Sequence, residues 1–311
     1  MFYTDLHCDT LTRAKKPGER MCNNRLQADF LRLKAAGCAA QCFAVFLRGG
    51  TSADFYEYVR LFNEQVAENS AVCAPVLSCA DLKAAMAAGK LGCILTAENI
   101  GFVRSGEEAA LLRSAGVRMA SLVWNDENAL AYPNLKYAGG APDFSAREGR
   151  GLKPLGREVA AALDGAGIII DVSHLSDGGL GELLRGRKIP LVASHSDACA
   201  LHSVSRNLTD GQIKGIAGCG GVAGVNFCND FLGGDDAMES AVRHIAHIIN
   251  TGGEDCAAIG SDFDGMPPQR GMESCARMPE FLEKLSARFG SRVAEKVACK
   301  NFMRVFGAVC G

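Results

Sequence analysis

The sequence predicts an α/β fold, a (β/α)8 barrel of the TIM type, and three observations support this prediction. Eight short apolar runs alternate with segments of helical spacing along the chain. Runs of this kind are typical of parallel strands that are buried on both faces. Several of them end in histidine or in an acidic residue, which is where a barrel carries its functional groups. The length of 311 residues also suits one such barrel.

The eight strands are expected where apolar residues follow one another almost without interruption. They cover residues 1–9, 38–47, 91–98, 117–124, 168–172, 190–194, 221–227 and 256–259. The helices are expected where apolar residues recur every three or four positions, often just before a glycine. They cover residues 26–36, 55–66, 80–88, 107–114, 155–163, 180–184, 210–216, 238–249, 280–288 and 292–305.

A doubly wound open sheet is the competing architecture. It would usually carry a glycine-rich phosphate loop after its first strand, but this chain has His7-Cys8-Asp9 there. The polar segments 10–24, with a turn at Pro17-Gly18, and 125–150 are expected to be loops, and the longer one is a candidate active-site loop. No linker divides the chain, so we expect a single barrel domain, residues 1–311, that ends in two helices.

Composition narrows the possible functions. A net charge of −2 argues against a general binder of nucleic acid or of acidic membranes. No apolar run reaches the length of a membrane span, and the N-terminus has no recognisable signal peptide. The 14 cysteines are scattered and include no Cys-x-x-Cys pair, which favours buried free thiols over disulfides or a zinc ribbon. We therefore expect a cytoplasmic protein.

Side chains that can bind metal ions follow five of the expected strands. They are His7 and Asp9 (first strand), Glu98 (third), His174 (fifth), His195 (sixth) and Asp262 (eighth). The C-terminal ends of barrel strands meet at one mouth, so these side chains should converge. Imidazole and carboxylate are zinc ligands, and the set is large enough for two metal ions that share a bridging carboxylate.

Each of these residues also has a purely structural interpretation. A carboxylate can cap a helix or form a turn, as Asp264-Gly265 is expected to do, and a histidine can be buried and hydrogen-bonded. The placement of the whole set around one mouth favours the metal site. The other histidines are assigned to a loop (His202) and to surface or packing positions on one helix (His244 and His247). An alternative for His202 is that it supports the ligands of the site.

Several short motifs occur in a fixed order along the chain. They are Asp5-Leu6-His7-Cys8-Asp9-Thr10, Glu98, Gly151-Leu152-Lys153-Pro154-Leu155-Gly156, Asp171-Val172-Ser173-His174, Ser194-His195-Ser196, Ser205-Arg206-Asn207-Leu208-Thr209-Asp210, Val225-Asn226-Phe227 and Gly260-Ser261-Asp262-Phe263-Asp264-Gly265. In these motifs, and along nearly its full length, the chain resembles the membrane (renal-type) dipeptidases of the amidohydrolase superfamily.

The resemblance implies a dizinc site. In the family, the residues matching His7, Asp9 and Glu98 bind one zinc ion, and those matching Glu98, His174 and His195 bind the second. The residue matching Asp262 handles protons at the substrate, and the one matching Arg206 binds the substrate carboxylate.

The chemistry of these residues agrees with the resemblance. A hydroxide held by two zinc ions can attack an amide. Asp262 can accept the proton of that water and pass it to the leaving amine. Arg206 also has a structural alternative, which is a surface ion pair with Asp210.

One stretch departs from the family pattern. Animal members carry a substrate-contacting histidine after the fourth strand, and in this chain Trp124 or Asn125 occupies that place. Both are therefore candidate substrate-binding residues in a variant pocket.

The leading prediction is a zinc-dependent dipeptidase that binds two Zn²⁺ per chain, forms a homodimer and hydrolyses dipeptides with a free C-terminal carboxylate. The alternatives are another metal-dependent amide or lactone hydrolase on the same barrel, and a non-catalytic binding protein. Relatives that begin with His-x-His and use a lysine bridge are disfavoured by His7-Cys8-Asp9 and Glu98. A decayed enzyme would have lost a ligand, and each expected ligand is present.

Overall fold

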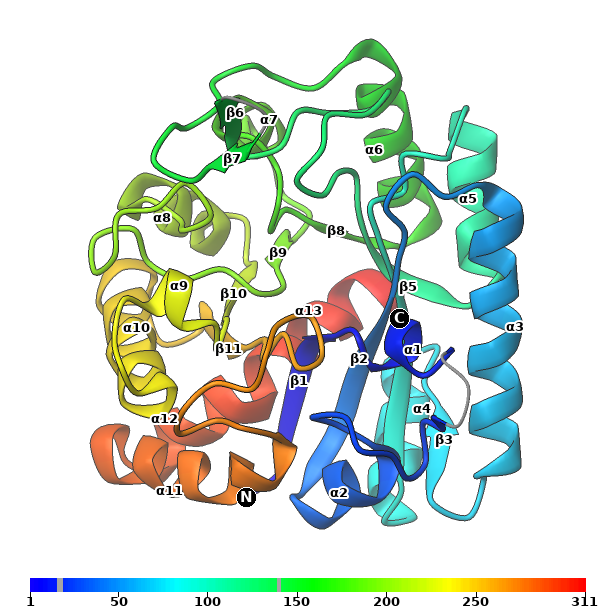
Figure 1. Ribbon diagram of the computed structural model, residues 1–311, viewed down its shortest axis with the longest axis vertical. Helices are drawn as coiled ribbons and strands as arrows, with labels where there is room; N and C mark the ends of the chain where they lie inside the picture. The colour runs from blue at the N-terminus through cyan, green and yellow to red at the C-terminus, as the bar shows by residue number, and fades with distance from the viewer. Residues whose placement is uncertain (16–18, 139–140) are drawn as a thin grey trace.

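A barrel of eight parallel strands forms the centre of the molecule (Figure 1). The computed structural model describes residues 1–15, 19–138 and 141–311. Neighbouring barrel strands pair in chain order: β1 (Tyr3–Cys8), β2 (Cys38–Phe46), β4 (Leu91–Glu98), β5 (Val117–Ser121), β8 (Ile169–Asp171), β9 (Val192–Ala193), β10 (Val222–Val225) and β11 (Ala257–Ile259). A parallel bridge between Cys8 and Phe263 brings the two ends of this sheet together. The predicted (β/α)8 fold is confirmed.

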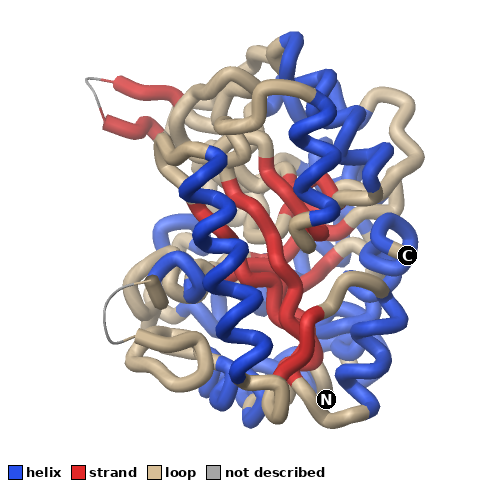
Figure 2. The backbone as a smooth tube through the Cα atoms, turned by 90° about the vertical axis from the view of Figure 1, so that its right-hand side faces the viewer, coloured by secondary structure: helices blue, strands red, loops and turns tan. Residues whose placement is uncertain are grey.

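Helices surround the strands, as the tube in Figure 2 shows. The longer ones are α2 (Phe30–Ala35), α3 (Ser52–Glu68), α4 (Cys79–Ala87), α5 (Gly106–Ser114), α6 (Pro154–Ala166), α7 (Asp177–Leu184), α8 (Asp210–Gly218), α10 (Ala237–Gly252), α11 (Met278–Phe289) and α13 (Asn301–Cys310). Most begin at a side chain that accepts a backbone N–H of the first turn, such as Thr51, Ser105 and Thr209. Within the described residues, no helix has both the length and the apolar character needed to cross a membrane.

The interior of the barrel is apolar at the end opposite the predicted site. Residues from all eight barrel strands form one buried cluster there, for example Leu6, Ile94 and Ile169. Phe302 and Phe306 of α13 belong to the same cluster, so the last helix covers this end of the barrel. Burying this apolar surface stabilises the fold. The predicted site residues lie at the other end.

Some local structure differs from the sequence prediction. Thr10–Arg13 form a short helix, α1, in a segment expected to be a loop. Thr10 Oγ1 donates to Asp264 Oδ2 at 2.5 Å and Arg13 Nε donates to Asp264 O at 3.0 Å. Tertiary contacts therefore stabilise a helical turn that the local sequence does not favour. The turn expected at Pro17-Gly18 lies outside the described residues.

The expected loop 125–150 contains a small hairpin, β6 (Lys136–Ala138) and β7 (Ala141–Asp143), which projects from the body in Figure 2. Two other short elements were not predicted: β3 (Cys73–Pro75), which pairs with β4, and α9 (Asn229–Leu232). Elements of three or four residues are too short to show a periodic apolar pattern.

The C-terminal helix expected at 292–305 is instead α12 (Ser291–Glu295), a π-helical turn (Lys296–Lys300) and α13. A short 3₁₀ turn, Cys275–Arg277, precedes α11. Asn301 Nδ2 donates to the carbonyls of Glu254 and Ala257, both at 2.8 Å. These bonds fix the start of α13 beside β11, directly after the π-helical turn.

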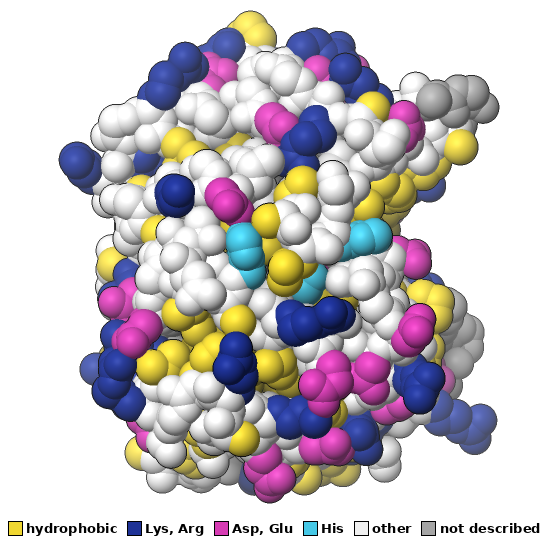
Figure 3. Space-filling view, turned by 90° about the vertical axis from the view of Figure 1, so that its left-hand side faces the viewer, with side chains coloured by type: hydrophobic (Ala, Val, Ile, Leu, Met, Phe, Trp, Pro, Cys, Tyr) yellow, Lys and Arg dark blue, Asp and Glu magenta, His cyan; other side chains and the backbone are white. Residues whose placement is uncertain are grey.

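All 14 cysteines are free thiols and most are buried, as the sequence predicts. On the face shown in Figure 3, basic and acidic side chains are interspersed over the surface. That distribution agrees with the small net charge of the chain.

Candidate metal centre and active site

The predicted metal-binding residues all lie at the C-terminal ends of the barrel strands. His7 belongs to the last part of β1, Asp9 follows that strand, and Glu98 is the last residue of β4. His174 and His195 follow β8 and β9 within three residues, because these strands are shorter than predicted. Asp262 follows β11. The sequence placed these residues at one mouth, and the structure brings them together there.

The first group consists of His7, Asp9 and Glu98, and is called the His7 cluster below. His7 Nε2 lies 3.5 Å from Asp9 Oδ2 and 3.7 Å from Glu98 Oε2. His7 Nε2 and Asp9 Oδ1 are buried without a hydrogen-bond partner among the described residues. Buried polar atoms are rarely left without a partner, so this cluster has the donor set of a cation site.

The second group consists of Glu98, His174 and His195, and is called the His174–His195 cluster. The two imidazole Nε2 atoms lie 3.0 Å apart. Glu98 Oε1 lies 3.0 Å from His174 Nε2 and 3.8 Å from His195 Nε2. Ligands about 2.0–2.1 Å from a tetrahedral zinc ion are about 3.3 Å apart, which lies within the range of these spacings.

Glu98 connects the two clusters. Its Oε2 faces His7 and its Oε1 faces His174. A carboxylate whose two oxygens face separate ligand sets can bridge two cations. The residues present therefore fit a pair of divalent ions.

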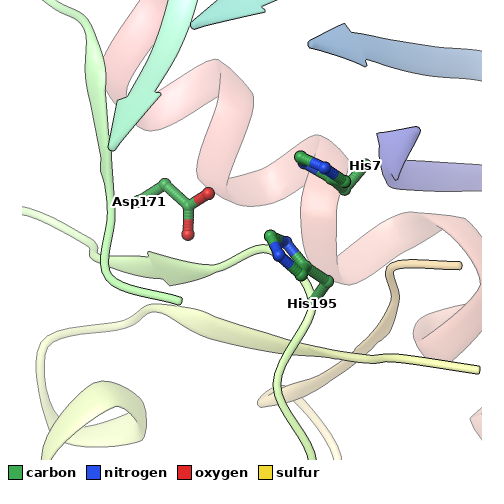
Figure 4. A group of neighbouring side chains, drawn as sticks. All are labelled: His7, Asp171 and His195. Carbon is green, nitrogen blue, oxygen red and sulfur yellow. The ribbon is translucent and has the colours of Figure 1, made fainter. Parts of the chain in front are cut away.

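A third set of potential ligands, His7, Asp171 and His195, lies beside these clusters. Figure 4 shows the Asp171 carboxylate extending toward the stacked rings of the two histidines. Both oxygens of Asp171 already accept hydrogen bonds from Ser173 and Ser194, at 2.5–3.0 Å. Oδ1 accepts three of these bonds and Oδ2 accepts one, so the carboxylate is held in place beside the two clusters.

The two clusters differ in electrostatics. Burial alone would lower the pKa of His7, but the carboxylates of Glu98, Asp9 and Asp262 raise it to about 10. Burial, together with the charges of Arg206 and His7, keeps the pKa values of His174 and His195 well below 6.5. Carboxylates thus dominate the surroundings of His7, whereas burial and nearby positive charge favour the neutral forms of His174 and His195.

Asp262 lies beside the His7 cluster. Its Oδ1 is 3.8 Å from His7 Nε2, and its Oδ2 accepts from Asn226 Nδ2 at 2.9 Å. The backbone of Asp262 is left-handed, with φ 61°, and its N–H donates to His7 O. A Cβ at Gly265 would collide with the carboxylates of Asp262 and Asp9, so a larger residue there would displace them. Burial raises the pKa of Asp262 to about 6.

A cavity of about 440 Å³ opens above the clusters. Its walls include every predicted site residue except His7. Trp124 contributes an aromatic wall beside Phe46, at 5.0 Å between ring centroids. Asn125 Oδ1 lies 2.8 Å from His174 Nδ1, so this residue contacts a predicted ligand as well as the cavity.

Arg206 is 2 % exposed and lies on the wall of the same cavity. Nη1 donates to Ser173 O and Ser196 Oγ, and Nη2 lies 3.2 Å from His195 O and 3.3 Å from His174 Nε2. Among the described residues no carboxylate forms an ion pair with Arg206. Asp210 pairs with His247 at 2.7 Å. The alternative surface pair between Arg206 and Asp210 is therefore wrong.

Sequence reasoning did not assign roles to Asp171, Ser194 or Asn226. All three lie at or just after barrel strands, and that position is the signal that could have identified them. His244 and His247 take packing and surface positions, as predicted. His244, for example, is buried between Ala198 N and Leu232 O.

The comparisons with known proteins agree with this geometry. A family profile described as membrane dipeptidase (peptidase family M19) matches residues 1–310. A Klebsiella pneumoniae protein, described as uncharacterized and encoded in the pqqA 5′ region, is 35% identical over 212 residues, which is 66% of this chain and 77% of that protein. An uncharacterized dipeptidase of Schizosaccharomyces pombe is 34% identical over 64% of this chain. The match covers 48% of that protein, so the chain spans about half its length.

Solved structures show the same fold. A metallopeptidase of family M19, the dipeptidase AC, superposes with a TM-score of 0.88 at 24% identity, covering 100% of this chain and 99% of the other. A Rhodobacter sphaeroides metallopeptidase, liganded with a phosphinate mimic of the dipeptide L-Ala-D-Ala, gives 0.87 at 23% identity, covering 99% of both chains. The profile match over the whole length is decisive: the chain belongs to the membrane dipeptidase family, peptidase family M19, and is a metallodipeptidase.

Proposed function

We propose that the protein is a zinc-dependent dipeptidase that uses two zinc ions to hydrolyse dipeptides with a free C-terminal carboxylate. One observation carries this proposal. The two ligand clusters share Glu98, and a buried guanidinium, Arg206, lies on the wall of the same cavity and has no acidic partner among the described residues. The first feature suits a hydrolase that uses two metal ions, and the second suits recognition of a substrate carboxylate.

His7, Asp9 and Glu98 would hold one zinc ion, and Glu98, His174 and His195 the other. When bound, the two ions would lower the pKa of water and polarise the amide carbonyl. Asp262 accepts the proton of the attacking water and delivers it to the leaving amine, because it lies at the rim of the His7 cluster and is not required as a ligand. Asn226 holds the far oxygen of Asp262, so Oδ1 is the atom that faces the reaction.

Arg206 binds the substrate carboxylate in this proposal. Nε has no hydrogen-bond partner among the described residues, and one Nη2–H faces His174 Nε2 at 3.3 Å. When His174 Nε2 binds a metal ion, its lone pair can no longer accept a hydrogen bond from Arg206. The Nη2–H that faces it then becomes available to the substrate. Nε and Nη2 then form the edge of the guanidinium that can bind a carboxylate through two parallel hydrogen bonds.

Trp124 and Asn125 would line the subsite for the rest of the substrate. Trp124 lies between Phe46 and His174, where its ring can cover an apolar side chain. Asn125 uses Oδ1 for His174, which leaves its Nδ2 as a donor toward the cavity. The predicted cytoplasmic location and homodimer stay predictions.

Dipeptides that differ only at the C-terminus test the proposed function. The zinc-loaded protein should cleave free dipeptides and cleave the same dipeptides with a C-terminal amide poorly. Equal rates on the free and the amidated dipeptides would show that the protein does not recognise the C-terminal carboxylate. That result would favour a broader amide hydrolase. Cleavage of lactones but of no dipeptide would favour the alternative lactone hydrolase.

A further inference from the structure

We infer that Asp171, Ser194 and Asn125 are positioning residues that fix the tautomers of His195 and His174, so that both imidazoles present the Nε2 lone pair to a metal ion. This inference rests on the proposed function, because it concerns the second zinc ion. It adds three residues that the ligand set does not include. A metal-binding histidine requires its other ring nitrogen to be held in a defined way.

The tautomer of His195 follows from which atoms can donate a hydrogen between Asp171, Ser194 and the His195 ring. Ser194 Oγ lies 2.5 Å from Asp171 Oδ2 and 2.7 Å from His195 Nδ1. A carboxylate accepts hydrogen bonds only, so the single hydroxyl hydrogen of Ser194 is donated to Asp171. Ser194 Oγ must then accept from His195 Nδ1–H. His195 Nε2 is left without a hydrogen and faces the cluster.

A single hydrogen bond gives His174 the same tautomer as His195. Its Nδ1 lies 2.8 Å from Asn125 Oδ1, which is an amide carbonyl oxygen and accepts only. The hydrogen of His174 is therefore on Nδ1. Two imidazoles from neighbouring strands thus direct bare Nε2 atoms at each other across 3.0 Å, an arrangement that a cation between them would stabilise.

The support for His195 is built rigidly into the barrel. Asp171 Oδ1 accepts from Ser173 N, Ser173 Oγ and Ser194 N at 2.9–3.0 Å. Gly224 and Gly260 of the two following strands pass so close to Ser194 O that a Cβ on either would collide with it. The two glycines consequently let the backbone of Ser194 pack closely against the neighbouring chain segments.

The variant Asp171→Asn tests the inference, because it changes the direction of one hydrogen bond at nearly constant shape. Three donors face Oδ1, so the new amide places its carbonyl oxygen there and its NH₂ group toward Ser194 Oγ. The Ser194 hydroxyl then donates to His195 Nδ1 at 2.7 Å, which is nearer than the other acceptor within reach, Ser173 Oγ at 3.1 Å. The hydrogen of His195 moves to Nε2, where it blocks the metal. Ser194→Ala removes the link but does not impose the wrong tautomer.

The measurement is a chelator competition on zinc-loaded protein, followed for each of the two ions. Asp171→Asn should weaken one of the two by roughly 10- to 100-fold and leave the other nearly unchanged. Ser194→Ala should weaken the same ion less. Ser240→Ala, which removes a buried serine hydroxyl from α10, is the matched control and should weaken neither. Circular dichroism checks that each variant is folded.

Nitrogen-15 NMR of the histidine rings gives a readout that a loss of packing would not change. Wild type should show His174 and His195 protonated at Nδ1, and Asp171→Asn should show His195 protonated at Nε2. Unchanged zinc affinity and an unchanged His195 tautomer in folded Asp171→Asn would overturn the inference. If wild type itself binds fewer than two zinc ions, the proposed function fails instead, and the NMR result still decides the tautomers.

Discussion

The two ligand clusters share Glu98 but are built on opposite electrostatic principles. The His7 cluster gathers carboxylates around one imidazole, and their charge raises the pKa of His7 to about 10. The His174–His195 cluster places two neutral imidazoles beside a buried arginine, and their pKa values lie well below 6.5. The first cluster attracts a cation through charge, whereas the second must offer lone pairs held in the correct tautomer. The predictions below test this contrast, on both clusters together, on each cluster separately and on a reference histidine outside them.

Glu98→Gln should have the largest effect, because Glu98 belongs to both clusters. An amide lacks the charge needed to hold two cations close together. We expect dipeptide hydrolysis to fall to the uncatalysed background while the fold is kept, as followed by circular dichroism. A folded Glu98→Gln protein with near wild-type turnover would show that the residue is structural only.

Asp262→Asn should affect proton transfer beside the His7 cluster and leave the His174–His195 cluster unchanged. If Asp262 transfers protons, turnover should fall by on the order of 10²- to 10⁴-fold while both zinc ions are kept. Steady-state kinetics and elemental analysis of the same preparation measure the two quantities. Loss of zinc from this variant would make Asp262 a ligand, and the proton transfer would have to be reassigned.

Arg206→Ala should affect substrate binding beside the His174–His195 cluster. Loss of one partner of a buried charge pair costs about 2–5 kcal/mol, so kcat/KM for free dipeptides should fall by roughly 30- to 5,000-fold. Hydrolysis of the corresponding dipeptide amides should change little. Arg206→Lys is the matched variant, since it keeps the charge without the two parallel donors. An equal loss on free and amidated dipeptides would argue against carboxylate recognition.

His244 offers a reference for a neutral imidazole that lies outside both clusters. Its burial lowers its pKa to about 4, below the unfolded value near 6.5. The neutral form is favoured in the fold, so its contribution to stability is present above pH 6.5 and is lost as the pH falls through 4. The free energy of unfolding of wild type should drop by up to about 3 kcal/mol more over this range than that of His244→Gln. Parallel pH curves for the two proteins would contradict this.

The sequence predicted where the candidate ligands lie better than it predicted the hydrogen bonds around them. Apolar runs that end in His7, Glu98 or Asp262 mark strand ends, and the closed barrel brings strand ends together whatever the exact strand length. The role of Asp171 depends on the direction of its hydrogen bonds to Ser194, which no spacing along the chain reveals.

The local structure that could not be predicted has a similar cause. Helix α1 depends on contacts with Asp264, more than 250 positions away in the chain. The β6–β7 hairpin is too short to show alternation. The contact between Asn125 and His174 joins two strand ends across 49 positions, so the sequence could place Asn125 in the pocket but could not show its bond to a ligand.

The central claim, that Glu98 joins two zinc sites into one catalytic centre, is tested most directly by adding zinc to metal-free protein. Zinc bound and dipeptide hydrolysis are followed together, and the free protein is checked for retained fold. We expect two equivalents to bind and activity to reach its plateau only at the second. A plateau at one equivalent, or binding that stops at one, would contradict the account.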